Sequence, residues 1–105
     1  MPREKYQTLT EQMFYVLLCL QEEYCGVDIM KRVSEITAQR VIIGPGTLYS
    51  LLDSFVSQEL IIQTGLDNRK KSYKITPSGQ AMLEKEYHRL QQLTMDYKHF
   101  RKEVE

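Results

Sequence analysis

Four basic side chains stand within six residues of one another in the second half of the chain. They are Arg69, Lys70, Lys71 and Lys74. Clustered Lys and Arg side chains bind the phosphates of nucleic acids, because they displace the counterions that surround the backbone. With Asn68 beside it and only Asp67 opposing it, this cluster predicts a basic turn that lies along phosphates or enters a minor groove. The alternative is a solvated turn without a ligand.

A second set of polar side chains has the chemistry to read base edges. Thr47, Tyr49 and Ser50 follow the sequence Gly44-Pro45-Gly46, which predicts the start of a helix. Their hydroxyl groups form hydrogen bonds with bases or phosphates, and the free N–H groups of a first helical turn suit a phosphate. Asp53 can accept from a cytosine amino group but repels phosphates, so its role stays open.

The cysteines and histidines do not form a recognisable catalytic or metal-binding pattern. Cys19 and Cys25 lack the spacing of a CxxC site, and His88 and His99 lie 11 residues apart, too far for ligands on adjacent helical turns. We therefore expect no enzyme activity, no metal and no cofactor. The thiols are predicted to be reduced and at least partly buried, with a redox-sensing thiol as the alternative.

Length and composition indicate one ordinary globular domain. The 105 residues are 42% apolar and 27% charged, and the net charge is zero. A neutral sum counts against nucleic-acid binding by the whole surface, but it allows a local basic feature to bind. Because no apolar run is long enough for a membrane span and no secretory segment is visible, we expect a cytoplasmic protein that does not bind membranes.

Hydrophobic periodicity predicts the elements that must position these side chains. They are a helix opening at residues 8–11, a second helix over 27–37, a third from about Thr47, strands over 60–64 and 72–76, and a last helix over 77–103. Thr8 and Glu11 have capping-box spacing, residues 24–26 form a turn, and residues 65–71 join the two strands.

The third helix carries one predicted buried stripe, made of Leu48, Leu51, Leu52 and Phe55. The expected fold class is mainly α with a small β-hairpin, a winged helix-turn-helix followed by a long helix.

That last helix is too long for a compact three-helix core. Its apolar seam follows alternating spacings of four and three, which indicates a partner helix. The seam residues are Leu83, Tyr87, Leu90, Thr94 and Tyr97. We expect a homodimer in which residues 1–76 bind DNA and residues 77–105 dimerise, the two forming one compact domain. The alternative is a helix folded onto its own core.

The chain also resembles the PadR-type winged-helix transcriptional regulators, in particular the short branch with a single C-terminal helix. The matching motifs are Gly46-Thr47-Leu48-Tyr49, Glu59-Leu60-Ile61, Arg69-Lys70-Lys71-Ser72-Tyr73 and Ile75-Thr76-Pro77-Ser78-Gly79. The resemblance implies a homodimeric repressor that binds a palindromic operator and responds, in some members, to small aromatic or hydrophobic compounds. It also adds Lys31, near the second helix, as a phosphate contact.

The chain departs from the family pattern at several positions. Val27 stands in place of an aromatic residue, Ser50 in place of a common proline, and Asp53 and Ser54 in place of frequent basic residues. These differences leave less positive charge on the third helix.

The sequence therefore predicts a double-stranded DNA operator as the main partner. The predicted contacts are Thr47, Tyr49, Ser50, Lys31, Asn68, Arg69, Lys70 and Lys71. Two alternatives remain. One is a sensor whose aromatic pocket between subunits, lined in part by Tyr87, Met95, Tyr97 and Phe100, controls binding. The other is a winged-helix adaptor for a protein partner.

Overall fold

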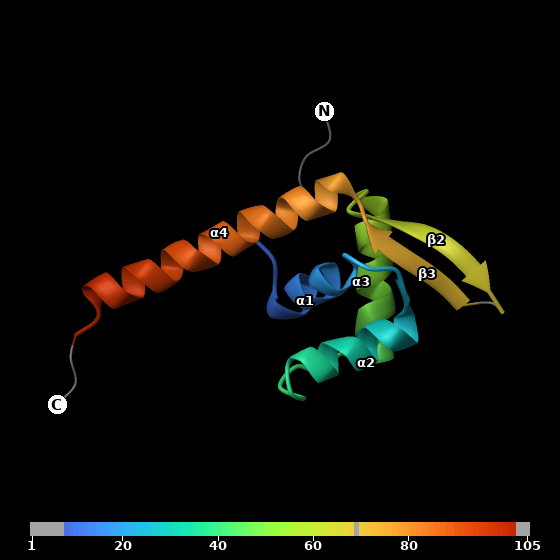
Figure 1. Ribbon diagram of the computed structural model, residues 1–105, viewed down its shortest axis with the longest axis horizontal. Helices are drawn as coiled ribbons and strands as arrows, with labels where there is room; N and C mark the ends of the chain where they lie inside the picture. Colours follow the sequence, from blue (N-terminus) through green and yellow to red (C-terminus); the bar gives the residue numbers. More distant parts are fainter. Residues whose placement is uncertain (1–7, 69, 103–105) are drawn as a thin grey trace.

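The computed structural model describes residues 8–68 and 70–102. In chain order its elements are α1 (Glu11–Cys19), β1 (Tyr24–Cys25), α2 (Gly26–Ile36), α3 (Pro45–Ser57), β2 (Ile61–Asp67), β3 (Lys70–Ile75) and α4 (Pro77–Phe100). Helices α1 to α3 pack together, the β2–β3 hairpin projects from one side and α4 from the other (Figure 1). The predicted fold, a mainly helical winged helix-turn-helix with a long last helix, is confirmed. Within the described residues no helix combines the length and the apolar composition that crossing a membrane requires.

The core lies where the first three helices meet the sheet and the start of α4. Its largest fully buried side chains are Phe55, Leu17, Leu20, Ile29, Leu48, Leu52, Ile61, Val16 and Val33. The predicted stripe of α3 supplies three of them, and its fourth member, Leu51, is half-buried against the same cluster. Because one face of α3 is fixed in the core, its opposite face is presented to solvent in a defined orientation.

The first helix begins two residues later than its predicted cap. Thr10 is the N-cap residue: its Oγ1 accepts from the N–H of Met13 at 3.2 Å, and its own N–H donates to the Met13 sulfur at 3.5 Å. The predicted capping box of Thr8 with Glu11 is therefore wrong. Leu9 is buried, which keeps the preceding residue outside the helix.

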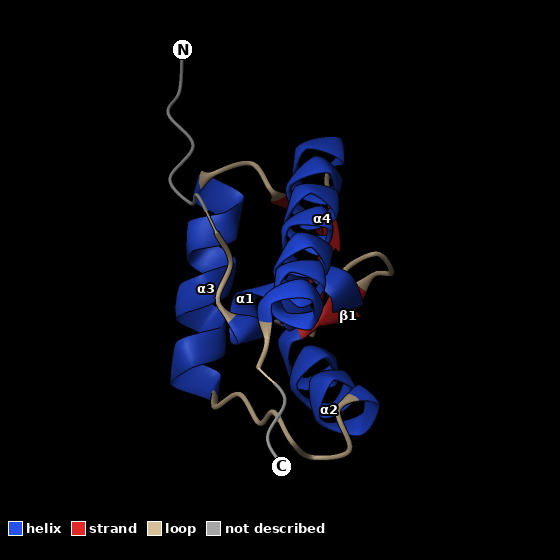
Figure 2. Cartoon of the chain, turned by 90° about the vertical axis from the view of Figure 1, so that its left-hand side faces the viewer, coloured by secondary structure: helices blue, strands red, loops and turns tan. Residues whose placement is uncertain are grey.

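The sheet is antiparallel with the order β1–β3–β2. Tyr24 and Cys25, predicted as part of a turn, instead form the short strand β1 opposite Tyr73 and Ser72 of β3. Two residues are too few to show an alternating pattern, so only the pairing with β3 reveals this strand. In Figure 2 the strands lie behind the helices, at the end of the molecule opposite the free end of α4.

The hairpin is longer than the sequence predicted. Its strands stay in register out to Asp67 opposite Lys70, so the connection between them covers only residues 68–69 instead of 65–71. The register shifts between Gln63 and Gly65, which makes the intervening Thr64 a β-bulge. Gly65 lies within the strand, and not in a turn.

Helix α4 begins at a cap that also joins it to the end of α3. The Oγ1 of Thr76 accepts from the N–H of Gly79 at 3.1 Å and donates to the carbonyl of Glu59 at 2.7 Å. From this root the helix runs to Phe100, and its second half leaves the body (Figure 1). Residues 103–105, part of which was predicted as helix, lie outside the described residues.

Candidate nucleic-acid interface

The first turn of α3 presents unpaired backbone donors in open surroundings. Its N-cap, Gly44, has no side chain to accept a hydrogen bond, and Pro45 at the first helical position has no N–H. The next N–H groups, those of Gly46 and Thr47, have no carbonyl available within the helix. A Cβ added at Gly44 or Gly46 would meet nothing within 4 Å. The helix dipole adds partial positive charge here, so this turn can receive a phosphate.

The outward face of α3 carries the predicted base-reading side chains. Thr47, Tyr49, Ser50 and Asp53 are all exposed, whereas Leu48 on the opposite side is fully buried. Such an arrangement leaves hydroxyl and carboxylate groups in solvent, available for hydrogen bonds to base edges.

Tyr49 has a second contact that the sequence did not show. A Cβ built on Gly26 would lie 2.8 Å from the Tyr49 hydroxyl oxygen and 2.9 Å from its Cε1. The ring therefore sits directly over Gly26 at the start of α2, although 46% of the side chain stays exposed. Gly26 holds α2 and α3 close together, and it gives Tyr49 a fixed position.

The hairpin meets α3 at Tyr73. This side chain is 5% exposed, and burial raises the pKa of its phenol, with smaller contributions in the same direction from Asp53 and Tyr49. Both neighbours belong to the outward face of α3. The face of β3 that carries Tyr73 is therefore the face turned toward α3.

Strand geometry divides the basic residues of the hairpin between two faces. Side chains alternate along β3, so Lys71 shares the α3-facing side with Tyr73, while Lys70 and Lys74 share the other side with Ser72. All three lysines are exposed. The sequence cluster is thus one basic side chain beside α3 and two on the reverse.

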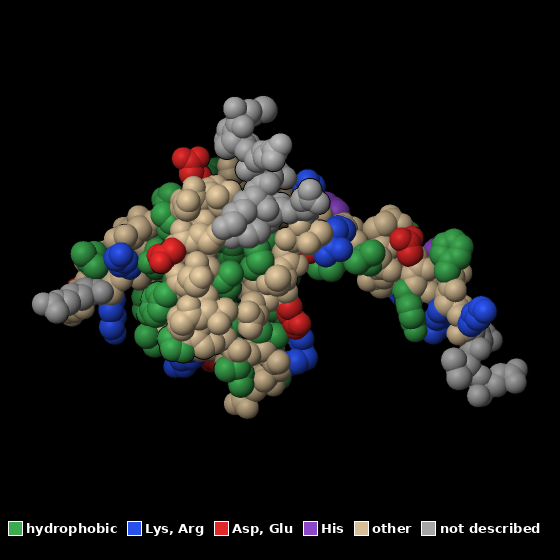
Figure 3. Space-filling model, turned by 180° about the vertical axis from the view of Figure 1, so that it is seen from behind, with side chains coloured by type: hydrophobic (Ala, Val, Ile, Leu, Met, Phe, Trp, Pro, Cys, Tyr) green, Lys and Arg blue, Asp and Glu red, His purple; other side chains and the backbone are tan. Residues whose placement is uncertain are grey.

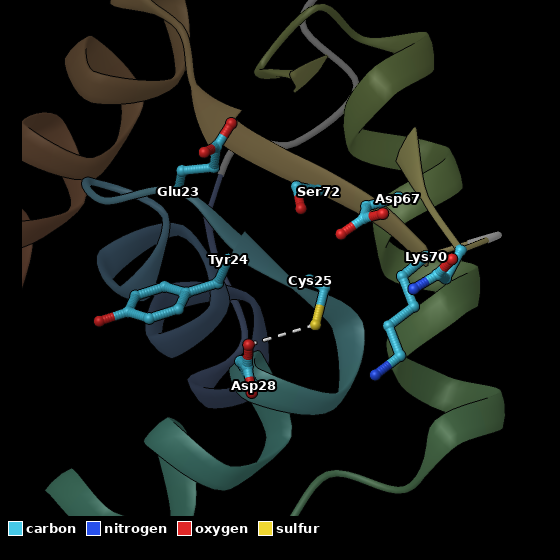
Figure 4. Close-up of a pocket in the computed structure, with 8 residues that line it drawn as sticks. Glu23, Tyr24, Cys25, Asp28, Asp67, Lys70 and Ser72 are labelled. Carbon is cyan, nitrogen blue, oxygen red and sulfur yellow. Dashed lines mark hydrogen bonds between the residues drawn. The ribbon is translucent and has the colours of Figure 1, made fainter. Parts of the chain in front are cut away.

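The reverse face borders a polar cleft of about 290 Å³. It is lined by Glu23, Tyr24, Cys25, Asp28, Asp67, Asn68, Lys70 and Ser72. Figure 4 shows Lys70 and Asp67 on the hairpin side and Cys25 with Asp28 on the α2 side; the Cys25 thiol donates to Asp28 Oδ2 at 3.3 Å. Three carboxylates line this cleft against one lysine, so it does not favour a phosphate.

The remaining predicted contacts are dispersed. Asn68 is exposed at the hairpin turn with a φ of 48°, in the left-handed region that asparagine tolerates. Arg69 lies outside the described residues. Lys31 is exposed on α2, on the side away from Ile29 and Val33. None of these observations tests a contact with DNA.

The two thiols differ in their surroundings. Cys19 is buried, and burial raises its pKa to about 11, with Arg32 acting in the opposite direction. It is therefore a neutral thiol near pH 7. Cys25 is half-buried at the edge of the cleft. In the part of the chain that the structure describes, no group of three His, Cys, Asp or Glu side chains comes together as a metal site.

Helix α4 divides into a packed half and a free half. In the packed half, Leu83 is 4% exposed and belongs to the core of its own subunit. Tyr87, Leu90, Thr94 and Tyr97, the other members of the predicted seam, are exposed. Figure 3 shows hydrophobic side chains along the free half where it leaves the body.

The buried face of α4 continues along a different set of residues from the predicted seam. Leu83 and Glu86 are its buried members, and steps of four and three lead on through Leu90, Leu93, Tyr97 and Phe100. Sequence analysis missed Leu93 and Phe100, because the burial of Glu86 in place of Tyr87 cannot be read from residue type.

Glu86 owes its burial to a small network at the root of α4. Its Oε2 accepts from the backbone N–H of Leu9 at 3.2 Å, and its carboxylate accepts two hydrogen bonds from Arg89, at 2.7 and 2.6 Å. The Arg89 hydrogen bonds hold the pKa of Glu86 below its usual range, although burial alone would raise it. This network ties the segment before α1 to α4.

Comparison with known proteins gives concordant matches. Residues 16–85 match the model of the transcriptional regulator PadR-like family. A PadR-like transcription factor from Bacteroides fragilis superimposes with a TM-score of 0.70 and 25% identity, over 84% of this chain and 86% of that one. A PadR-like regulator from Bacillus cereus gives 0.71 and 20% over 88% and 92%. A transcriptional regulator from Clostridium thermocellum gives 0.72 and 20% over 88% and 93%. No curated protein matches the chain in sequence.

Proposed function

Because the chain belongs to the PadR-like transcriptional regulator family, we propose that it is a cytoplasmic, homodimeric repressor that binds a palindromic DNA operator. In this proposal residues 1–76 bind DNA and residues 77–105 dimerise. Helix α3 enters the major groove, where Thr47, Tyr49 and Ser50 meet base edges. Lys31 and the hairpin residues Asn68, Arg69, Lys70 and Lys71 contact the backbone.

One observation carries the proposal: the open first turn of α3 and the α3-facing side of the hairpin lie on the same side of the molecule. Tyr73 joins them, since it lies near Tyr49 and Asp53. A duplex lying against α3 therefore meets Lys71 as well. Phosphate contacts set the position of the protein, and the α3 side chains supply selectivity.

Selection of bound sequences from a random duplex pool tests this proposal directly. We expect an inverted repeat whose half-sites lie about one helical turn, ~34–36 Å, apart. Affinity for the selected duplex should fall by orders of magnitude between about 50 and 200 mM salt. A pool that yields no enriched sequence, together with no salt-sensitive complex, would favour a protein partner instead.

Two kinds of variant separate positioning from selectivity. Thr47→Val and Ser50→Ala remove hydroxyls from α3, so they should change the preferred sequence and leave the salt dependence intact. Lys71→Ala should weaken all duplexes alike and reduce the salt slope by about 0.9. Equal loss of affinity for every sequence in the Thr47 and Ser50 variants would contradict base reading by α3.

Dimerisation is proposed to use the free half of α4. Leu93, Tyr97 and Phe100 are 51%, 67% and 83% exposed in a single chain. They lie on the same side of the helix as Leu83, so a second copy of α4 can extend the buried face. Burying such side chains contributes about 1.5–3 kcal/mol each.

A matched pair of variants tests the dimer contact. Leu93 and Met95 have nearly equal exposed fractions, 51% and 52%. Two residues apart, they point about 200° apart around the helix axis. In sedimentation equilibrium Leu93→Ala should raise the dimer dissociation constant about tenfold or more, whereas Met95→Ala should leave it unchanged. Equal effects, or a wild-type monomer at micromolar concentration, would overturn the proposed interface.

A further inference from the structure

The β-bulge at Thr64 changes which side of the hairpin Leu66 occupies. Before the bulge, Ile61 and Gln63 lie opposite Ile75 and Tyr73, on the side turned toward the helices. Uninterrupted alternation would place Leu66 on the reverse side. The extra residue restores it to the helix-facing side, directly opposite Lys71.

Leu66 and Lys71 therefore form a cross-strand pair next to α3. Lys71 is two residues beyond Tyr73, about 7 Å further along the strand toward the hairpin turn. Leu66 is 65% exposed, so the pair has left the core although it lies on the core-facing side. An apolar group and a cation stand together at the border of the surface that α3 presents.

The hairpin carries a chemically similar pair on its other side. Ile62, 53% exposed, lies opposite Lys74. That side also carries Lys70 and borders the cleft with its three carboxylates. The two pairs match in composition and differ in whether they face α3, so the charge around them favours a polyanion only on the Leu66–Lys71 side.

The minor groove of a duplex matches this pair in chemistry. Its walls present deoxyribose C–H groups, its rims carry phosphates, and apolar side chains of other proteins enter it. The floor of the groove differs between base pairs: a G·C pair adds the guanine 2-amino donor, which an A·T pair lacks. A leucine side chain cannot accept a hydrogen bond from that donor, so it favours A·T pairs.

We propose that the Leu66–Lys71 pair enters the minor groove flanking the major-groove site of α3, and that Leu66 makes A·T pairs preferred there. The inference rests on the proposed DNA-binding function and adds a selectivity residue outside α3. In this arrangement Lys71 neutralises a phosphate on the groove rim, while Leu66 packs against deoxyribose. Sequence selectivity then arises in the flank without a hydrogen bond to a base.

The test uses the full-length protein and the operator obtained by selection, in three forms of the flank: A·T, G·C and inosine·C. Inosine lacks the 2-amino group, so inosine·C resembles A·T in the minor groove and G·C in the major groove. Wild type should bind the A·T and inosine·C flanks alike and the G·C flank about tenfold more weakly, about 1.4 kcal/mol.

Four single variants assign the effect to the pair. Leu66→Ala and Leu66→Thr should bind the A·T flank about tenfold more weakly, lose the discrimination against G·C, and keep the wild-type salt slope. Lys71→Ala should keep the flank preference and reduce the salt slope by about 0.9. Ile62→Ala serves as the matched control and should bind all three flanks as wild type does. Far-UV circular dichroism confirms that each variant is folded.

The failures of the two proposals can be told apart. If wild type binds its operator with steep salt dependence but Leu66→Ala and Ile62→Ala behave alike, the minor-groove assignment is wrong and DNA binding stands. If wild type prefers A·T over inosine·C, the preference comes from the major groove, and the assignment is also wrong. If wild type shows no salt-dependent complex, both proposals fall.

Discussion

Replacing Gly79 with alanine places the sharpest available strain on the root of α4. A Cβ at this position would lie 2.1 Å from the Leu60 carbonyl oxygen and 2.7 Å from Ile75 Cγ1. The Leu60 oxygen is backbone, and it accepts a hydrogen bond from the Thr76 N–H at 3.0 Å. It therefore cannot rotate away as a side chain would, and either α4 or the start of β2 must move by about 1 Å.

The expected loss of stability follows from three contributions. Inserting a methyl group into a packed contact costs about 1–3 kcal/mol. Loss of the hydrogen bond from Thr76 to Leu60 costs about 1 kcal/mol more. The higher helix propensity of alanine returns up to about 1 kcal/mol. Gly79→Ala should thus lower the free energy of unfolding by about 1–3 kcal/mol.

Urea unfolding followed by circular dichroism measures this change, at one fixed protein concentration because a dimer's stability depends on it. Gly46→Ala is the matched control: it also replaces a glycine in the first turn of a helix, but its Cβ meets nothing within 4 Å. The control should stay within about 0.5 kcal/mol of wild type. A Gly79→Ala protein that unfolds at the same urea concentration as the control would refute the packing argument.

Three further predictions concern single groups. Because Arg89 lowers the pKa of Glu86, the carboxylate stabilises the fold above its ordinary pKa of 4.5, and this stabilisation is lost as the pH falls through the lower folded value; the difference in unfolding free energy between wild type and Glu86→Gln should therefore shrink on acidification from about pH 6 to pH 3, and a constant difference would contradict the linkage. Glu59 has a φ of 60° after α3, so Glu59→Gly should raise the melting free energy by about 1 kcal/mol in calorimetry, and a loss of stability would argue against strain there. Iodoacetamide at neutral pH should label Cys25 in the native protein and Cys19 only after unfolding, as mass spectrometry would show, since Cys19 is buried with a pKa raised to about 11; native labelling of Cys19 would exclude that burial.

The helices could be predicted from sequence because each carries a local record of its buried face. In α3, Leu48, Leu52 and Phe55 recur at helical spacing, and the structure buries all three. Pro77 and Thr76 likewise predicted the start of α4, and the cap at Thr76 is present. These signals lie within one or two helical turns, so no knowledge of the rest of the chain is needed.

The features that sequence analysis missed depend on contacts between distant segments. Strand β1 exists only through its pairing with β3, and Glu86 is buried only because the N–H of Leu9, 77 residues away, donates to it. The candidate site shows the same limit. Lys70 and Lys71 are neighbours in sequence, but the register of the hairpin sends them to opposite faces.

The same long-range contacts connect the dimerisation helix with the hairpin. The N–H of Ile75, at the end of β3, donates to the carbonyl of Leu20 at 2.7 Å, and Thr76 then joins β3 directly to α4 while its hydroxyl holds Glu59. No flexible linker separates the hairpin from the helix that is proposed to pair with a second copy. A change in the direction of α4 must therefore displace the hairpin as well. In a dimer that displacement alters the distance between two sets of DNA contacts, so the short segment around Thr76 sets the operator spacing that the protein accepts.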